Sequence, residues 1–496
     1  MAKELLEKPF YGPEPLAKGT ISYRDAENCI FEPGGDGVYL TRRPSIITNL
    51  SSYAVSASVK EIHGLFHWVD GARIIAVVKY TDNTFRVEQI QQGMAPFIYS
   101  EVLSSNANYI TFAPGEKQDG TKILYIGGVS PAGTGGVCYL EGTFLRTVTS
   151  ATLAATPSGG SVAYINSRFV TNIRNSSKFI FTDTNPATGL LDIGYWESSD
   201  NPLSCESKSD NLVGLTVHWN EIYAWGYRSI EIWQDDGVTP FVPNRGAEMQ
   251  FGLISVGTVV EINNSIFAYG MLSGDFVVVS ITNRNLVVIS KPIESILKEY
   301  GTTQPRIATA CTIATRTSQL YILTITAMNN TRHVLVYNLT TDTWTNFNSA
   351  TTTLNYKYVE YMSAARISST DRTLVALRYN STIFETGTDS SDASGVIAVT
   401  RRTSWIDHNT WKRKRCDSIY LRLKRGQASG VIRLRWLDDG RTTWSPYYNI
   451  QLNVVDFISR NYRMGMYHSR RYEFTMSDNA DFVLVGSDED VTILRD

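Results

Sequence analysis

Short runs of alternating apolar and polar residues constrain this chain more than any other feature. Each run is rich in β-branched or aromatic residues and is separated from the next by Gly, Asn, Asp or Thr, which is the pattern of strands joined by turns. Only residues 291–301 predict a helix, because Pro292 stands near the start and Gly301 at the end. The chain is therefore predicted to be all-β. The clearest strand runs are residues 72–80, 122–128, 265–270, 275–280, 319–326 and 333–339.

Pairs of such strands recur through the middle of the chain, at residues 221–237, 265–290 and 333–347. Their spacing is roughly 40 to 50 residues, which is the length of one four-stranded propeller blade. Residues 61–400 are therefore predicted to form a β-propeller, with about six to eight blades. Trp233 and Trp344 lie on strands within these pairs and are predicted to be buried between blades.

The two ends of the chain have different patterns. Residues 1–60 are rich in Gly, Pro and charge with little periodicity, so they are predicted to form an extended arm laid on the surface. Residues 401–496 contain evenly spaced strands with turn residues between them. That pattern predicts a C-terminal β-sandwich-like domain.

The overall charge and the cysteines exclude several classes of protein. The net charge is −2 and the pI about 6.4, so no global field draws the chain to nucleic acid or to a membrane. The five cysteines are far apart and none has CxxC spacing, which predicts neither a disulfide framework nor a zinc site, and synthesis in a reducing cytoplasm. The N-terminus has no apolar leader and no window is long enough to span a bilayer.

No sequence motif predicts catalysis, and no cofactor or metal is expected. The nucleophile-elbow, phosphate-loop and metalloprotease patterns are all absent from the sequence. His63 and His67 have a spacing that suits metal binding on a helix, but Gly64 and the following strand favour two ordinary histidines beside a turn. Residues 437–444 resemble the Asp-box turn of sialidases, and Asp438, Asp439 and Gly440 are interpreted as a structural turn.

A group of basic residues is the strongest surface signal. In residues 417–426 and 430–436 apolar residues alternate with cations, so each strand is predicted to have one apolar and one basic face. If the two strands pair, their cations share one sheet face. That face is interpreted as a solvated surface or as a contact with carboxylates of a protein neighbour, with a DNA or phosphate contact as the alternative. The residues are Lys412, Arg413, Lys414, Arg415, Arg422, Lys424, Arg433 and Arg435.

Several segments in a fixed order resemble the tail hub, nozzle or packaged-DNA-stabilisation proteins of short-tailed bacteriophages. Residues 24–33 and 40–46 resemble the opening arm of that family, with Ser45 where Gly is expected. The strongest match is residues 179–237, which end in Gly226-x-x-Ser229-Ile230-Glu231-x-Trp233. The units that follow are residues 251–252, 274–301, 333–344, 434–444 and 470–486.

The resemblance implies a structural virion protein without catalytic residues, in which Gly226, Glu231, Trp233 and Trp344 maintain the fold. It implies a homo-oligomeric ring, expected as a hexamer, below the portal and its adaptor. That ring would extend the conduit for double-stranded DNA, retain the packaged genome until ejection, and contact fibre, spike or needle proteins. The chain itself would not insert into a membrane.

Two other classes of function remain open from the residues alone. One is a propeller glycan hydrolase of the sialidase type, which would need paired carboxylates about 5 to 9.5 Å apart in a central funnel. The other is a kelch-like binding module.

Overall fold

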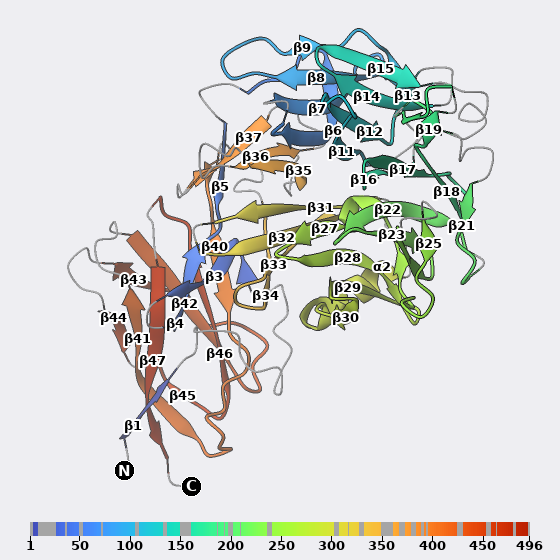
Figure 1. The fold of residues 1–496 in the computed structure, drawn as a ribbon. Coiled ribbons are helices and arrows are strands. Elements are labelled where there is room, and N and C mark those ends of the chain that lie inside the picture. Colours follow the sequence, from blue (N-terminus) through green and yellow to red (C-terminus); the bar gives the residue numbers. More distant parts are fainter. Residues whose placement is uncertain are drawn as a thin grey trace.

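The computed structural model consists almost entirely of strands (Figure 1). The residues that the structure describes are 3–7, 26–34, 37–48, 53–70, 73–104, 109–131, 136–148, 160–185, 187–192, 194–196, 202–208, 210–235, 241–301, 307–315, 317–326, 332–348, 361–366, 373–377, 383–387, 391–392, 395–423, 430–452, 458–462, 464–479 and 483–494. In these residues no helix is long and apolar enough to cross a membrane.

Seven groups of antiparallel strands in the described part of the chain form the blades of a propeller, and six of them are separate sheets. Blade 1 contains β6 (Val59–Trp68), β7 (Arg73–Tyr80), β8 (Phe85–Ile90) and β10 (Leu103–Ser104), with the short β9 (Phe97–Ile98) and β13 (Ser130–Pro131). Blade 2 contains β11 (Thr111–Glu116), β12 (Lys122–Gly127), β14 (Val137–Glu141) and β15 (Phe144–Val148). Blade 3 contains β16 (Val162–Ile165), β17 (Arg168–Asn172), β18 (Lys178–Phe181) and β21 (Leu203–Ser204).

The remaining blades repeat the same meander. Blade 4 contains β22 (Leu212–His218), β23 (Glu221–Gly226), β24 (Ile230–Gln234) and β25 (Val242–Pro243). Blade 5 contains β26 (Gly252–Leu253), β27 (Val260–Ile262), β28 (Ser265–Leu272), β29 (Asp275–Thr282) and β30 (Asn285–Val288). Blade 6 contains β31 (Ile307–Ala314), β32 (Gln319–Thr326), β33 (Arg332–Asn338) and β34 (Thr343–Asn346). Blade 7 contains β35 (Tyr361–Arg366), β36 (Thr373–Leu377), β37 (Ile383–Gly387) and the early strand β5 (Ser45–Thr48).

The ring of blades is closed in two ways. The first strand of blade 7, β35, contacts β6 of blade 1 as well as β31 of blade 6. The outermost strand of blade 7 is β5, which pairs with β37 from Ser45↔Gly387 to Thr48↔Phe384. Because β5 precedes blade 1 in sequence, blade 7 combines strands from the start and from the end of the propeller segment. Ser45 is the first residue of β5.

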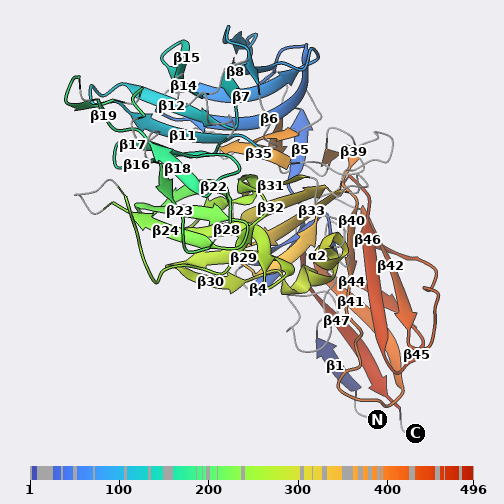
Figure 2. The same ribbon diagram turned by 90° about the vertical axis from the view of Figure 1, so that its right-hand side faces the viewer.

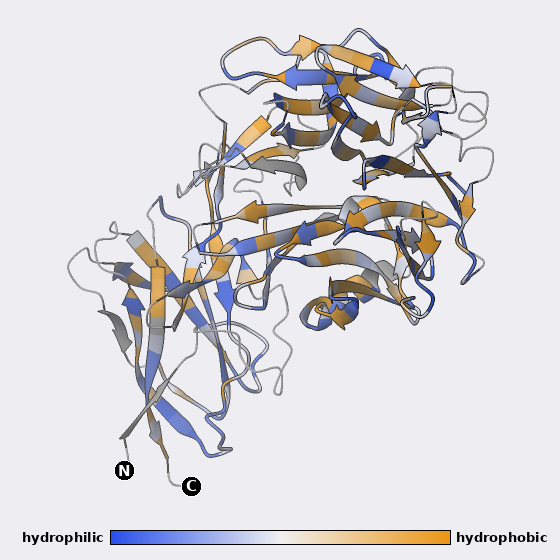
Figure 3. Cartoon of the chain, viewed as in Figure 1, coloured by the Kyte–Doolittle hydropathy of each residue, from blue (hydrophilic) through white to orange (hydrophobic). Residues whose placement is uncertain are grey.

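Apolar residues between neighbouring blades hold the propeller together. Each pair of adjacent blades shares one cluster of buried side chains, including the pair formed by blades 7 and 1. The alternation of hydropathy along the strands follows this packing (Figure 3). The predicted helix is confirmed as a 3₁₀ turn at Lys291–Ile293 followed by α2 (Glu294–Gly301), which packs Ile293, Ile296 and Leu297 into the cluster of blades 5 and 6.

A β-sandwich projects from the propeller (Figures 1 and 2). One sheet has the order β3 (Cys29–Gly34), β4 (Gly37–Arg42), β47 (Val483–Ile493), β41 (Lys414–Leu423) and β44 (Ile458–Tyr462), with β1 (Lys3–Glu7) and β45 (Met466–Tyr467) beside it. The other contains β40 (Val399–Arg402), β46 (Arg470–Met476), β42 (Gly430–Asp438) and β43 (Tyr448–Leu452). Alternate residues of β41 and β42 share the core between the two sheets.

The two-residue strand β2 (Ala26–Glu27) joins propeller and sandwich into one continuous sheet. It pairs parallel to β34 of blade 6 and antiparallel to β40 of the sandwich, which gives a nine-stranded sheet across the junction. The described strands of the first 60 residues are thus built into both bodies, and Cys29 and Ile30 are buried. The division into residues 1–60, 61–400 and 401–496 stays a prediction, whereas the all-β class with a propeller is confirmed.

Candidate functional site

The axis of the propeller contains a cavity of about 450 Å³. Its described lining combines apolar residues with His63 and several hydroxyl side chains, such as Tyr109, Thr111, Thr216 and Thr309. No Asp or Glu occurs among those lining residues. A glycosidase needs two carboxylates on either side of the scissile bond, and this lining does not supply such a pair.

His63 lines the same cavity but is already engaged. Its Nε2 lies 2.9 Å from Oε2 of Glu61, and its ring packs edge-on against Phe85. Both His63 and His67 belong to β6, so the helical spacing that would suit a metal does not apply. Within the described residues, no group of three His, Cys, Asp or Glu side chains could hold a metal ion.

The basic residues of the C-terminal region do not form one face, which corrects the assumption that β41 and β42 pair. β41 pairs with β47, β44 and β45, whereas β42 pairs with β43 and β46. The alternation was predicted correctly, but the apolar faces of both strands meet in the core. Their basic faces must therefore point to opposite outer surfaces of the sandwich.

Four of these cations are already engaged within the sandwich. Lys414 is fully buried, and burial lowers the pKa of its ammonium group. Arg415 pairs with Asp417 at 2.8 Å, and Arg422 with Asp488 at 2.9 Å. Arg435 donates to Glu473, as described next. Lys412, Arg413 and Arg433 are exposed, and Lys424 lies outside the described residues.

The outer face of β42 contains an ordered group around Glu473. This carboxylate is 1% exposed and accepts from Arg435 and Arg402 at 2.5 Å each and from the Tyr447 hydroxyl at 2.9 Å. The guanidinium of Arg435 also lies over the rings of Trp444 and Tyr447. Burial opposes ionisation of Glu473, but the bonds from the two arginines outweigh it and hold the pKa of its carboxyl below the usual value.

Gly226 and Glu231 organise the edge of blade 4. A Cβ at Gly226 would lie 2.6 Å from the Asp210 carboxylate, which accepts from the backbone N–H of Arg228 at 2.5 Å. Glu231 is 7% exposed and accepts from the backbone N–H of Ser207 at 2.7 Å. Glu231 thus bonds the loop after blade 3 to the β23–β24 hairpin, and Gly226 leaves room for the Asp210 carboxylate, which does the same. The role of Gly226 and Glu231 in maintaining the fold stays a proposal.

Trp233 and Trp344 both lie between blades, as predicted. Trp233 is 4% exposed in the cluster of blades 3 and 4, where it packs edge-on against Phe179 at 5.1 Å. Trp344 is 5% exposed in the cluster of blades 5 and 6. Its Nε1–H donates to the Ile289 carbonyl at 2.8 Å, which fixes the approach to α2.

A buried polar node at the junction was not predicted from the sequence. Arg43 is 2% exposed; its Nε donates to Oδ1 of Asn28 at 2.9 Å and its Nη1 to Asp392 at 3.0 Å. Asn28 has a φ of 55° and its side chain also bonds the N–H of Asn348 and the carbonyl of Ala398. The node therefore links the arm, blade 6, the exit from blade 7 and the start of the sandwich.

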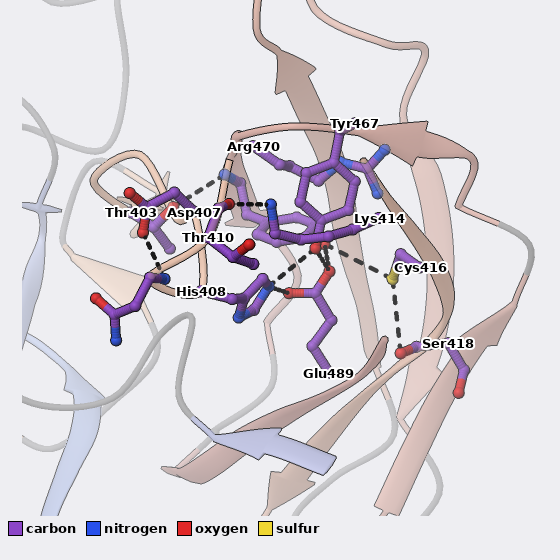
Figure 4. Close-up of polar contacts among 12 residues, drawn as sticks. Thr403, Asp407, His408, Thr410, Lys414, Cys416, Ser418, Tyr467, Arg470 and Glu489 are labelled. Atoms are coloured by element: carbon purple, nitrogen blue, oxygen red, sulfur yellow. Dashed lines mark hydrogen bonds and ion pairs between the residues drawn. The ribbon is translucent and has the colours of Figure 1, made fainter. Parts of the chain in front are cut away.

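A second buried network lies in the far half of the sandwich (Figure 4). Glu489 is fully buried and accepts from the hydroxyls of Tyr467 and Tyr472 at 2.6 and 2.5 Å, with Nε2 of His408 3.3 Å from its other oxygen. Burial opposes ionisation, but these donors lower the pKa of the Glu489 carboxyl. The sequence signal for this site was weak, because three consecutive acids at 488–490 resemble a solvated turn.

The predicted turn after β42 is confirmed, and its two aspartates also bond residues 468–470. The strand ends at Asp438, and Gly440 has a φ of 74°. The Asp439 carboxylate accepts from the N–H groups of His468 and Ser469 at 2.9 Å each. Asp438 accepts from Nε of the buried Arg470 at 2.6 Å, a pair that the Asp-box interpretation did not include.

The blades and the apolar clusters between them define the chain as a β-propeller protein. Residues 129–373 match the family model described as phage stabilisation, Bacteriophage P22 Gp10, β-propeller. This match confirms the resemblance to the tail hub and packaged-DNA-stabilisation proteins of phages. It supports a structural role in the virion tail, in assembly with other virion components, over an enzymatic one.

The other comparisons are distant. No curated protein matches the chain. Among solved structures, the C-terminal WD40 domain of Sif2 is 10% identical with a TM-score of 0.35, over 68% of this chain and 97% of that one. An exo-β-1,3-galactanase from Phanerochaete chrysosporium is 8% identical with a TM-score of 0.27, over 77% of this chain and 99% of that one. The Aleuria aurantia lectin is 9% identical with a TM-score of 0.31, over 60% of this chain and 96% of that one. These likenesses carry no argument about function.

Proposed function

We propose that copies of this chain form a ring, expected as a hexamer, in the tail below the portal and its adaptor. The ring extends the DNA conduit, retains the packaged genome until ejection, and provides contacts for fibre, spike or needle proteins. The chain would be synthesised in the host cytoplasm and end in the virion. The match of residues 129–373 to the phage-stabilisation propeller carries this proposal.

The charge of the chain fits a conduit through which DNA must slide. Each phosphate that a protein neutralises strengthens binding to DNA and adds about 0.9 to the slope of log K against log salt concentration. Such binding would slow the movement of DNA along the conduit. A net charge of −2 supplies no overall attraction for DNA. We therefore propose that the exposed cations of the sandwich face protein neighbours, where carboxylates compensate them.

Arg433 gives the cleaner test of this contact. Reversal of Arg435 would leave Glu473, which is 1% exposed, beside a second carboxylate, and would damage the sandwich itself. Arg433 is exposed on the same outer face, so Arg433→Glu is expected to weaken assembly without lowering the melting temperature. Normal assembly combined with loss of tight, salt-sensitive binding to duplex DNA would instead identify a DNA site.

Mass photometry with negative-stain imaging tests the ring directly. Six copies of the 55.4 kDa chain would give a particle of about 330 kDa with a central opening. A protein that stays monomeric at all concentrations, with or without the portal–adaptor complex, would overturn the proposal.

A further inference from the structure

The loop at the free end of the sandwich exposes a large apolar side chain beside two exposed cations. Trp411 is 85% exposed, the highest value among the exposed large apolar side chains of the described residues. Lys412 and Arg413 follow it and are exposed, and Met466 on the adjacent β45 is 47% exposed. We call residues 405–413 together with Met466 the tip loop. It lies where β41 begins and β47 ends, beside the chain termini and far from the propeller (Figures 1 and 2).

The buried Lys414 and the exposed His468 bond the backbone of the tip loop. Nζ of Lys414 donates to the carbonyls of Thr410, Lys412 and His468 at 2.7, 2.8 and 2.5 Å. Nδ1 of His468 lies 2.8 Å from the Trp411 carbonyl. Lys414 and His468 thus bond the backbone carbonyls of Trp411 and of the residues on either side of it.

The Glu489 network fixes the first half of the same loop. His408 has a φ of 51°, and its ring turns inward to Glu489 and to the Tyr467 hydroxyl at 2.9 Å (Figure 4). Burying a carboxylate and an ammonium group is unfavourable unless hydrogen bonds compensate both charges. Stability alone does not explain why ionisable groups are buried beneath a loop that exposes a tryptophan. Pre-ordering a loop lowers the entropy cost of binding, and Trp and Arg are the residues that most often dominate protein interfaces.

The opposite end of the molecule provides a complementary surface. Met94, Phe97 and Ile98, at and before β9 on the rim of blade 1, are 65%, 47% and 40% exposed, and Glu101 follows on the same segment. Figures 1 and 2 place blade 1 and the tip loop at opposite ends of the molecule. An apolar patch with an acid beside it matches a tryptophan followed by two cations.

The distribution of charge along the chain also favours a contact between the sandwich of one copy and the propeller of another. Residues 401–496 contain 17 Lys and Arg against 12 Asp and Glu, whereas residues 1–400 contain 29 against 36. The sandwich unit is therefore positive by 5 and the remainder negative by 7. Unlike surfaces at two ends of one chain produce heterologous, head-to-tail contacts, which generate rings when the rotation closes.

We propose that the tip loop docks on the blade 1 rim of a second copy of this chain, with Trp411 packed against Met94, Phe97 and Ile98. Lys412 and Arg413 then lie near Glu101 of that copy. This inference rests on the proposed ring and specifies one of its contacts. A contact with a different tail protein, or with a lipid surface, is a separate possibility that the test separates from it.

The test compares the assembly of full-length variants by mass photometry and sedimentation velocity. Trp411→Ala and Phe97→Ser are each expected to raise the dissociation constant of assembly at least tenfold while leaving the melting temperature unchanged, since both side chains are exposed. Trp219→Ala is the matched control, because Trp219 is 66% exposed on blade 4, away from both surfaces. The pair Lys412→Glu and Arg413→Glu should weaken assembly, and adding Glu101→Lys should restore part of it.

The outcomes separate this contact from the ring itself. If the wild type forms rings and Trp411→Ala and Phe97→Ser assemble as the wild type does, the tip contact is wrong and the ring stands. If the wild type never assembles, both the ring and the contact are wrong. Binding of the wild type to vesicles of phosphatidylglycerol that Trp411→Ala abolishes, with normal ring assembly, would assign the tip loop to lipid instead.

Discussion

The propeller and the sandwich are both β-structures, but they differ in the charged groups that they bury. Adjacent blades of the propeller meet through apolar clusters, and Trp233 and Trp344 lie within two of them. Both regions bury carboxylates, among them Glu88 and Glu385 in the propeller and Glu473 and Glu489 in the sandwich. The sandwich also buries the cations Lys414 and Arg470 in its strands. Apolar interfaces tolerate variation and repeat easily, whereas buried charges fix particular loops in particular places. The comparison suggests that the propeller is the scaffold and that the sandwich presents surfaces to neighbours.

The largest expected effect tests the apolar half of this comparison. Trp233→Ala and Trp344→Ala should each lower the free energy of unfolding by about 3–5 kcal/mol, because each leaves a cavity between two blades. Urea denaturation followed by tyrosine fluorescence and far-UV circular dichroism measures the change. A wild-type urea midpoint in either variant would contradict the claim that the apolar clusters between blades stabilise the propeller.

Acid should destabilise the sandwich before the propeller. The folded-state pKa values of Glu473 and Glu489 lie below their ordinary value of 4.5. The contribution of these two carboxylates to the free energy of unfolding is therefore complete above about pH 4.5. It is lost as the pH falls through their folded-state pKa values. Hydrogen exchange of peptides from β46 and β47 should accelerate at acid pH before that of peptides from β28 and β29. Simultaneous acceleration in both regions would show that the buried carboxylates do not distinguish them.

Gly226→Ala gives a smaller and more local effect. The new methyl group would lie 2.6 Å from the Asp210 carboxylate, and such overpacking typically costs about 1–3 kcal/mol. Asp210→Ala in the same chain should remove part of that cost, so a double-mutant cycle in chemical denaturation should be clearly non-additive. Additive losses would mean that the two residues do not interact.

Glu231→Gln should have the smallest effect. The amide oxygen can still accept from the N–H of Ser207, so only the charge is lost, at roughly 0.5–1.5 kcal/mol. Glu231→Ala should cost more than Glu231→Gln in the same thermal denaturation series. Equal losses would show that the bond to Ser207 contributes nothing.

Much of the propeller could be predicted because alternation and turn residues depend on local sequence. The strand runs, the helix at residues 291–301 and the burial of both tryptophans follow from period, capping and flanking turns. The partners of strands do not follow in the same way. Alternation in β41 and β42 gives the apolar face of each strand, but two apolar faces can lie side by side in one sheet or face to face across a core. Here they lie face to face, which divides the predicted basic surface.

The polar nodes could not be predicted because they depend on contacts between distant segments. Arg43 lies in a charged arm and meets Asp392, 349 positions later. Glu489 lies among acids that resemble a solvated turn, and its donors are supplied by residues 408, 467 and 472. Neither position shows periodicity or a motif that marks it as buried.

Imaging of the purified wild-type chain tests the central claim most directly, that this propeller is a ring-forming component of the virion tail. Class averages from cryo-electron microscopy should show closed rings with a central opening, in which the sandwich of each copy contacts the next. Isolated seven-bladed particles with free sandwiches, at concentrations and salt conditions that favour association, would contradict the account.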